Sequence, residues 1–127
     1  MNPVELANEQ YLSITTFKRD GTPVSTPVWV AGENGNLLVI SEADSWKVKR
    51  IRRNGHVRVA PCSARGALRG DPIEAEATID KDTTTVEKLL AQKYGWMYRT
   101  YMCFSALART LRRQSTPTGV TIRITPR

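Results

Sequence analysis

The chain has 127 residues, a formal net charge of +7 at pH 7 and a sequence pI of about 9.9. This length suits one compact domain but gives one copy little room for a deep pocket, so a large cofactor is expected between two copies. No apolar run approaches the roughly 20 residues that cross a bilayer, and the start MNPVELANEQ lacks the apolar core of a signal peptide, so a cytoplasmic protein is predicted.

The first part of the chain predicts a short helix followed by a β-hairpin. Residues 2–10 suit a helix, because an Asn-Pro pair fits the N-cap and first helical positions. Residues 11–17, YLSITTF, are rich in β-branched and aromatic side chains, which is typical of a strand. An Asp-Gly turn then leads into a second strand over residues 24–31, VSTPVWVA. Pro27 has no N–H for a ladder, which favours an edge strand or a bulge.

A second turn, ENGN, precedes a strand and a basic helix. Residues 36–41, NLLVIS, are apolar on both faces and are expected at the centre of the sheet. Residues 45–54, SWKVKRIRRN, predict a short helix with a narrow apolar stripe of Val48 and Ile51. Gly55 is placed as the C′ glycine that ends this helix.

The second half of the chain continues with strands and two helical segments. Alternation over residues 73–79, IEAEATI, predicts a strand with one apolar face, and Asp82 is a candidate cap for the helix after it. The other expected segments are a strand at 56–61, a loop at 63–72, helices at 83–94 and 96–114 with Gly95 between them, and a last strand at 120–126. Strands in antiparallel hairpins with few helices predict a mostly β fold: a small barrel with helices outside.

Two cysteines, Cys62 and Cys103, are too few for a disulfide framework and lack metal-ligand spacing. Both are expected to be small buried apolar groups. No metal site is predicted.

The basic run at 45–54 has four interpretations. Nucleic-acid binding is disfavoured, because the chain has no helix-turn-helix pair, zinc ligands or RNP-like aromatic strand. A membrane surface is disfavoured because the apolar stripe is too short. A phosphorylated small molecule fits, since Ser41, Ser45 and Lys47 combine hydroxyls, an ammonium and a helix start. A solvated helix face without a ligand is the alternative.

The order of TPVWV, then LLVISEADSWKVKRIRRNGHVRVAPCSARG, then IEAEATI resembles the split β-barrel flavin and deazaflavin oxidoreductases, the pyridoxamine 5′-phosphate oxidase-like superfamily. The pattern S-x-K-x-x-x-x-x-x-N, followed by a strand and an Arg-Gly pair, resembles the coenzyme F420-dependent branch of actinobacteria, the FDOR-B type. The resemblance covers residues 9–80, is looser over 82–114 and returns at VTIRITP. It implies an FMN-binding split barrel as a single domain over residues 1–127.

The resemblance also implies a homodimer with two cofactor sites along its interface. It implies that the cofactor phosphate is held by the segment with Ser41, Ser45, Lys47 and Lys49, to which Arg50 is added. The cofactor ring is expected against Pro27, Val28, Trp29, Ala60, Pro61 and Cys62, with Arg65 as a further contact. Arg52, Arg53 or Arg65 would meet the tail carboxylates of F420, and FMN has no such tail.

The implied activity is hydride transfer between reduced F420 and a small conjugated, electron-poor acceptor. The alternatives are an FMN-dependent oxidoreductase and a non-catalytic flavin- or F420-binding protein. No catalytic side chain is assigned, and His56 is expected to be structural. Trp29 is interpreted as a ring contact or a barrel-wall residue. Tyr94, Tyr98 and Tyr101 are candidates for the acceptor pocket or the core.

Overall fold

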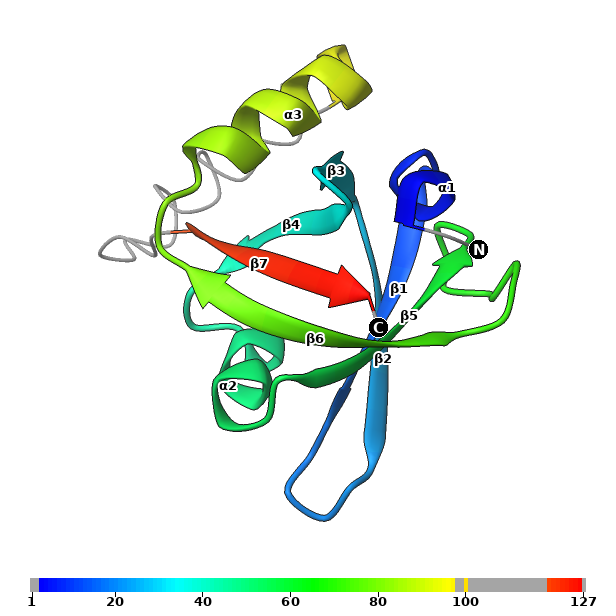
Figure 1. Cartoon of the computed structure of the whole chain (residues 1–127), viewed down its shortest axis with the longest axis vertical. Helices are drawn as coiled ribbons and strands as arrows, with labels where there is room; N and C mark the ends of the chain where they lie inside the picture. The colour runs from blue at the N-terminus through cyan, green and yellow to red at the C-terminus, as the bar shows by residue number, and fades with distance from the viewer. Residues whose placement is uncertain (1–2, 98–99, 101–118, 127) are drawn as a thin grey trace.

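The structure, a computed structural model, describes residues 3–97, 100 and 119–126 (Figure 1). Asn2, Tyr98, Tyr101, Cys103 and most of the predicted 96–114 helix lie outside these residues. The elements are, in order, α1 Pro3–Ala7, β1 Tyr11–Phe17, β2 Pro23–Val28, β3 Ala31–Glu33, β4 Asn36–Glu42, α2 Trp46–Arg53, β5 His56–Cys62, β6 Ile73–Asp80, α3 Thr84–Tyr94 and β7 Gly119–Pro126.

The strands form one antiparallel sheet in the order β2-β1-β5-β6-β7-β4-β3. The two ends of this order, β2 and β3, are consecutive in the chain and are joined only by Trp29 and Val30. So short a link requires the sheet to curl until its two edges approach each other. The predicted mostly β barrel with peripheral helices is therefore confirmed.

The single strand predicted over 24–31 is wrong, because the chain breaks at Trp29 and Val30 and changes partner. β2 pairs with β1, whereas β3 pairs with the start of β4. β3 reaches only as far as Leu38 on β4, so the end of β4 has no strand on that side. The barrel is split where this free part of β4 faces the free edge of β2. Pro27 lies on that edge strand, as predicted.

The barrel interior holds the main core, and α2 closes one end of it. Inward-facing residues of every strand except β2 and β3 are fully or almost fully buried there, together with Val30. Val48 and Ile51 of α2 join this core, as the predicted apolar stripe required. Each such buried aliphatic side chain contributes roughly 1.5–3 kcal/mol to stability. The basic residues of α2 are consequently left on its outer surfaces.

α3 packs on the outside of the barrel against β3 and β4 (Figure 1). Val86, Leu90 and Tyr94 are buried against Ala31 and Leu38. Leu38 faces this outer cluster, whereas Leu37 and Val39 face the interior. β4 is therefore covered on both faces, as its continuous apolar sequence indicated. The predicted position at the centre of the sheet is wrong, because β4 lies next to the edge strand β3 and its second face is covered by α3.

Most predicted boundaries agree with the structure, including β1, β5, β6, β7 and both hairpin turns. α1 is shorter than the predicted 2–10 helix, because the chain after Ala7 continues in tight turns, with Asn8 N–H donating to the Glu5 carbonyl. The N-cap position of α3 is Thr83, and Asp82 accepts from the Thr84 N–H at 2.9 Å, so Asp82 contributes to the helix start. Gly95 ends α3 with φ +58°, a left-handed conformation that favours glycine.

The predicted role of Gly55 as a left-handed C′ glycine is wrong. α2 ends at Asn54 in extended conformation, and Gly55 has no positive φ. Glycine is needed because the backbones of Gly55 and Ala77 touch: the Ala77 N–H donates to the Gly55 carbonyl at 2.7 Å. A Cβ at position 55 would lie 2.8 Å from the Ala77 carbonyl oxygen.

We predict that Gly55→Ala destabilises the fold by about 1–3 kcal/mol, because backbone rather than a movable side chain blocks the new methyl group. Chemical denaturation would measure the loss. Gly119→Ala is the matched control, since its Cβ would lie at an ordinary 3.6 Å from the nearest atom, the Ser41 carbonyl oxygen. Equal stability of the two variants would contradict the close packing at Gly55.

Candidate functional site

A cavity of about 460 Å³ lies at the split of the barrel. We call it the split cavity. One wall comes from β1 and β2 and the Trp29 that follows, and the other from the end of β4 and the start of α2. Its lining residues are Tyr11, Thr26, Pro27, Val28, Trp29, Ile40, Ser41, Glu42, Ser45 and Lys47. Its volume falls in the roughly 300–1,000 Å³ range of small-molecule sites.

Hydroxyl groups line the α2 end of the split cavity. Ser45 caps α2, since its Oγ accepts from the Val48 N–H at 3.4 Å. The same Oγ lies 3.0 Å from Oγ of Ser41 at the end of β4. The strand end, the helix start and two hydroxyls therefore meet at one point, a suitable arrangement for an anionic group.

Lys47 adds a positive charge to this end of the cavity. Its side chain is half-buried, and no hydrogen bond or ion pair holds its ammonium among residues 3–97, 100 and 119–126. Burial lowers the pKa of Lys47, while the Glu42 carboxylate acts in the opposite direction. A bound phosphate would compensate this desolvation better than one exposed carboxylate.

Trp29 also lines the cavity and is fixed by α3. Its ring stacks on Tyr94 with centroids 4.7 Å apart and an interplanar angle of 14°. The Tyr94 hydroxyl accepts from the Val30 N–H at 3.1 Å and donates to the Gln10 carbonyl at 2.7 Å. Tyr94 therefore provides a hydrogen-bond acceptor for the backbone N–H of Val30 at the strand break. It also supports the Trp29 ring that lines the cavity. Trp29 therefore lines the cavity and packs against the helix behind it, and its predicted contact with a cofactor ring stays a prediction.

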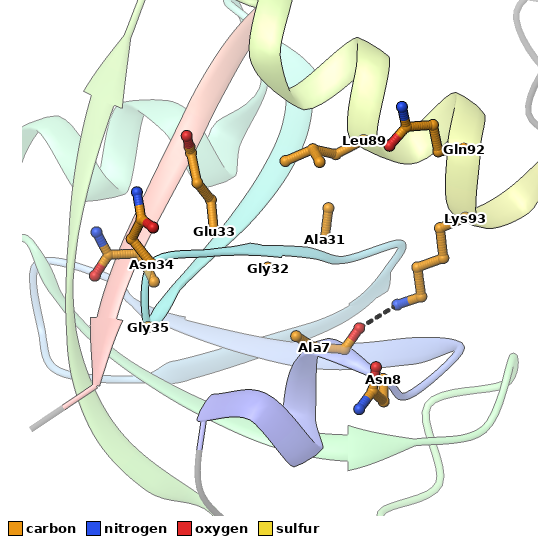
Figure 2. A pocket seen from close by; sticks show the side chains of 11 residues that line it. Ala7, Asn8, Ala31, Gly32, Glu33, Asn34, Gly35, Leu89, Gln92 and Lys93 are labelled. Carbon is orange, nitrogen blue, oxygen red and sulfur yellow. Dashed lines mark hydrogen bonds between the residues drawn. The ribbon is translucent and has the colours of Figure 1, made fainter.

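Lys93, next to Tyr94, ties three segments together. Its ammonium donates to the carbonyls of Ala7, Glu9 and Val30, each at 2.6 Å. Figure 2 shows this side chain reaching from α3 towards α1 across a second cavity of about 500 Å³. An ammonium has three donors, so Lys93 has none left for a ligand. The second cavity is lined otherwise by small residues, amides, Leu89 and Glu33, and offers no free cation for a phosphate.

Six predicted site residues come together at the split cavity. They are Pro27, Val28, Trp29, Ser41, Ser45 and Lys47. Four further lining residues were not predicted, namely Tyr11, Thr26, Ile40 and Glu42. Tyr11 had a usable signal, because it starts the strand that pairs with the Pro27 strand. No feature of the sequence pointed to Glu42, because a negatively charged side chain is not expected beside a phosphate-binding site.

The other predicted cations do not line the split cavity. Lys49 and Arg50 lie on another side of α2, in a pocket that also includes Arg53. Arg52 is exposed beside β6. Arg65 is exposed in the loop after β5, where its N–H donates to Ser63 Oγ at 3.3 Å.

Ala60, Pro61 and Cys62 lie one strand away from the cavity wall. β1 separates β5 from β2, so Ser13 pairs with Pro27 on one side and with Ala60 on the other. All three β5 residues are buried and none lines the split cavity of this chain. Cys62 is a buried apolar group as predicted, and burial raises the pKa of its thiol.

His56 has structural partners. Its Nε2 lies 2.7 Å from Glu74 and its ring stacks on Phe17 with centroids 5.4 Å apart. Arg58 shares Glu74, with Nε 2.9 Å from the carboxylate. Within the described part of the chain, no group of three His, Cys, Asp or Glu side chains is placed to hold a metal ion. The described helices are also too short or too polar to cross a bilayer.

Comparison with known proteins gives a family for this arrangement. The family model described as pyridoxamine 5′-phosphate oxidase matches residues 4–126. No curated protein matches the chain.

Three solved structures illustrate the shared fold. An F420 reductase is 19% identical with a TM-score of 0.61, and the alignment covers 97% of this chain and 91% of that one. A pyridoxamine 5′-phosphate oxidase-related, FMN-binding protein from Nostoc punctiforme is 14% identical with a TM-score of 0.59, covering 98% and 74%. The heme storage protein HutZ from Vibrio cholerae is 10% identical with a TM-score of 0.67, covering 98% and 87%.

The Tyr94 hydroxyl is predicted to lose its proton at a higher pH than the hydroxyl of an ordinary tyrosine. Burial raises the pKa of Tyr94 to about 12 from its usual 10. Because the folded state holds this proton more tightly, the stabilisation from the neutral phenol is complete below pH 10 and is lost as the pH rises through about 12. Ultraviolet absorbance of tyrosinate should show this late component, which Tyr94→Phe removes and Tyr11→Phe retains.

Tyr94→Phe should also destabilise the fold by roughly 1–3 kcal/mol, since the buried Val30 N–H loses its acceptor. A variant of wild-type stability, or titration of all tyrosines as one group near pH 10, would contradict the anchoring role.

Proposed function

The chain belongs to the pyridoxamine 5′-phosphate oxidase family, and we propose that it is an F420-dependent oxidoreductase within that family. It would transfer hydride between reduced coenzyme F420 and a small conjugated, electron-poor acceptor. In this proposal residues 1–127 form one split-barrel domain, and the cofactor occupies the split cavity.

The observation that carries the proposal is the composition of the split cavity. Ser41, Ser45 and Lys47, which would hold an anion, line the same cavity as the aromatic side chain of Trp29. A cofactor with a phosphate and a planar ring needs both kinds of contact. The half-buried ammonium of Lys47 has no hydrogen-bonding or ion-pair partner among the described residues, so this chain already holds a charge that a phosphate would neutralise.

The chain's own residues supply binding, orientation and water exclusion. A bound deazaflavin supplies the hydride chemistry itself. Ser41, Ser45 and Lys47 would fix the phosphate, and the Trp29 wall, held by Tyr94, would limit the positions open to the ring. Positioning of this kind accounts for much of the rate of a transfer that needs no general acid or base.

A homodimer is part of the proposal. The split cavity of one copy is open to solvent, and its β2 wall is an edge strand. A second copy would cover a bound ring and complete the acceptor pocket, giving two equivalent sites by symmetry. Sedimentation measurements should give twice the 14.2 kDa mass of one chain. A protein that is monomeric at micromolar concentration and still binds the cofactor would contradict the proposed homodimer.

An FMN-dependent oxidoreductase is the second candidate. The surplus of cations favoured F420 because of its carboxylate tail, but Arg52, Arg53 and Arg65 do not line the split cavity. The fold similarity to an FMN-binding protein supports FMN equally well.

Titration of the purified protein with oxidised F420 and with FMN tests the two candidates. Trp29 lines the cavity, so its fluorescence should be quenched by a bound ring. We expect tighter binding of F420. Tighter binding of FMN would favour the FMN-dependent oxidoreductase instead. If neither F420 nor FMN binds, both candidate functions are refuted.

Substitution of two neighbouring lysines tests the phosphate seat. Lys47→Ala should weaken binding of the preferred cofactor roughly 10- to 100-fold, since a charge-assisted contact contributes about 1.5–3 kcal/mol. Lys49→Ala removes the same charge from the same helix but outside the cavity, and should change the affinity less than about threefold. Equal losses would indicate a general electrostatic effect and would refute the assigned seat.

A further inference from the structure

The side of α2 that faces away from the split cavity forms a second pocket of about 580 Å³. We call it the basic pocket. α2 and the turn between β1 and β2 build it, and both lie in the lower half of Figure 1. Its lining residues are Lys18, Arg19, Trp46, Lys49, Arg50 and Arg53.

The basic pocket gathers five cations and no acidic side chain. None of these cations forms an ion pair with a carboxylate in the described parts of the chain. Asp20 lies in the same turn, but its carboxylate accepts from the Thr22 N–H at 2.9 Å and does not line the pocket. The charge in the pocket is therefore uncompensated, which favours a ligand with several negative charges.

Two of the arginines are held in place by β1. Arg53 Nη2 donates to the Phe17 carbonyl at 2.7 Å, and Arg50 Nη1 lies 3.5 Å from Thr16 Oγ1. Each guanidinium has five N–H donors, so most of them are left for a ligand. An arginine oriented in advance loses less side-chain entropy when it binds a phosphate.

Trp46 adds a planar surface to this charged pocket. Its residue is 69% exposed, although tryptophan is normally well buried. Lys49 Nζ lies 4.6 Å from the centre of its ring, and the exposure leaves much of the ring open to solvent. Aromatic rings beside cations are how proteins bind unpaired nucleobases, by stacking on the ring and contacting the phosphates.

We propose that the basic pocket is a nucleotide-binding site, separate from the split cavity, which takes a nucleobase on Trp46 and its phosphates on the surrounding cations. A free nucleoside triphosphate and a single-stranded nucleic acid share this chemistry. The absence of known motifs disfavours nucleic acid at the level of the sequence. The basic pocket, however, is built by α2 and a turn distant in the sequence, which such motifs do not describe.

Binding of ATP to the full chain tests the proposal, with tripolyphosphate and adenosine as probes that lack the base or the phosphates. Calorimetry at low and at physiological salt should show ATP binding tighter than either fragment. Trp46→Ala should weaken ATP binding roughly tenfold by loss of stacking and leave tripolyphosphate binding unchanged. Tripolyphosphate binding as tightly as ATP, with no effect of Trp46→Ala, would overturn the proposal.

Exposed lysines provide the matched charge variants. Lys18→Gln with Lys49→Gln should weaken ATP binding roughly 5- to 20-fold, from two surface charge contacts. Lys88→Gln removes an exposed cation from α3 and should have no effect. Equal losses in both would overturn the proposal, because they would show only an effect of net charge.

Two further experiments identify the source of the nucleotide and show whether the basic pocket is independent of the split cavity. A single-stranded oligonucleotide that binds more tightly than ATP, with steep salt dependence, would identify nucleic acid; the opposite order would identify a free nucleotide. Lys47→Ala should leave ATP binding intact. Loss of ATP binding in the presence of saturating F420 or FMN would overturn the proposal, because the pocket would then belong to the cofactor site.

Discussion

The backbone of Val30 is the constraint on which the barrel and its cavity depend. An N–H and a carbonyl buried at a strand break need partners, and leaving them unpaired would cost several kcal/mol. α3 supplies both, through Tyr94 for the N–H and Lys93 for the carbonyl. Without this helix, both groups would lose these partners. The strand break and the position of the Trp29 ring therefore depend on a helix more than sixty residues later in the chain.

α2 is the second organising element, because its short sequence serves three surfaces. Val48 and Ile51 close the barrel core, Ser45 and Lys47 face the split cavity, and Trp46 and Lys49 face the basic pocket. Its eight residues make just over two turns, so neighbouring positions point to different surfaces. Its positive charge is consequently divided between the split cavity, the basic pocket and the surface beside β6, where Arg52 lies, and a count of cations along the sequence does not reveal that division.

The strands and turns could be predicted from the sequence because their signals are local. Alternation over β6, the Asp-Gly and Asn-Gly turn signals and the apolar run of β4 each depend on neighbouring residues. The strand break could not, since VSTPVWVA reads as continuous and the partners of Val30 come from α3. Gly55 was misjudged for the same reason: its requirement comes from contact with Ala77. Of the residues that line the split cavity, Ser41, Ser45 and Lys47 were predicted from a strand end and a helix start, and Pro27, Val28 and Trp29 from the family resemblance. The position of Lys49 and Arg50 outside the cavity depends on the orientation of α2, which the sequence does not give.

The two-residue link between β2 and β3 also sets the shape of the opening. Val28 and Ala31 are three peptide units apart and so lie at most roughly 10 Å from each other. At that end the two walls are tethered, while the free ends of β2 and β4 have no such connection. The two walls of the split cavity are therefore held together by the chain beside Trp29 and are not linked in this way where Ser45 and Lys47 lie. A change in the separation of the walls would consequently be restricted most beside Trp29.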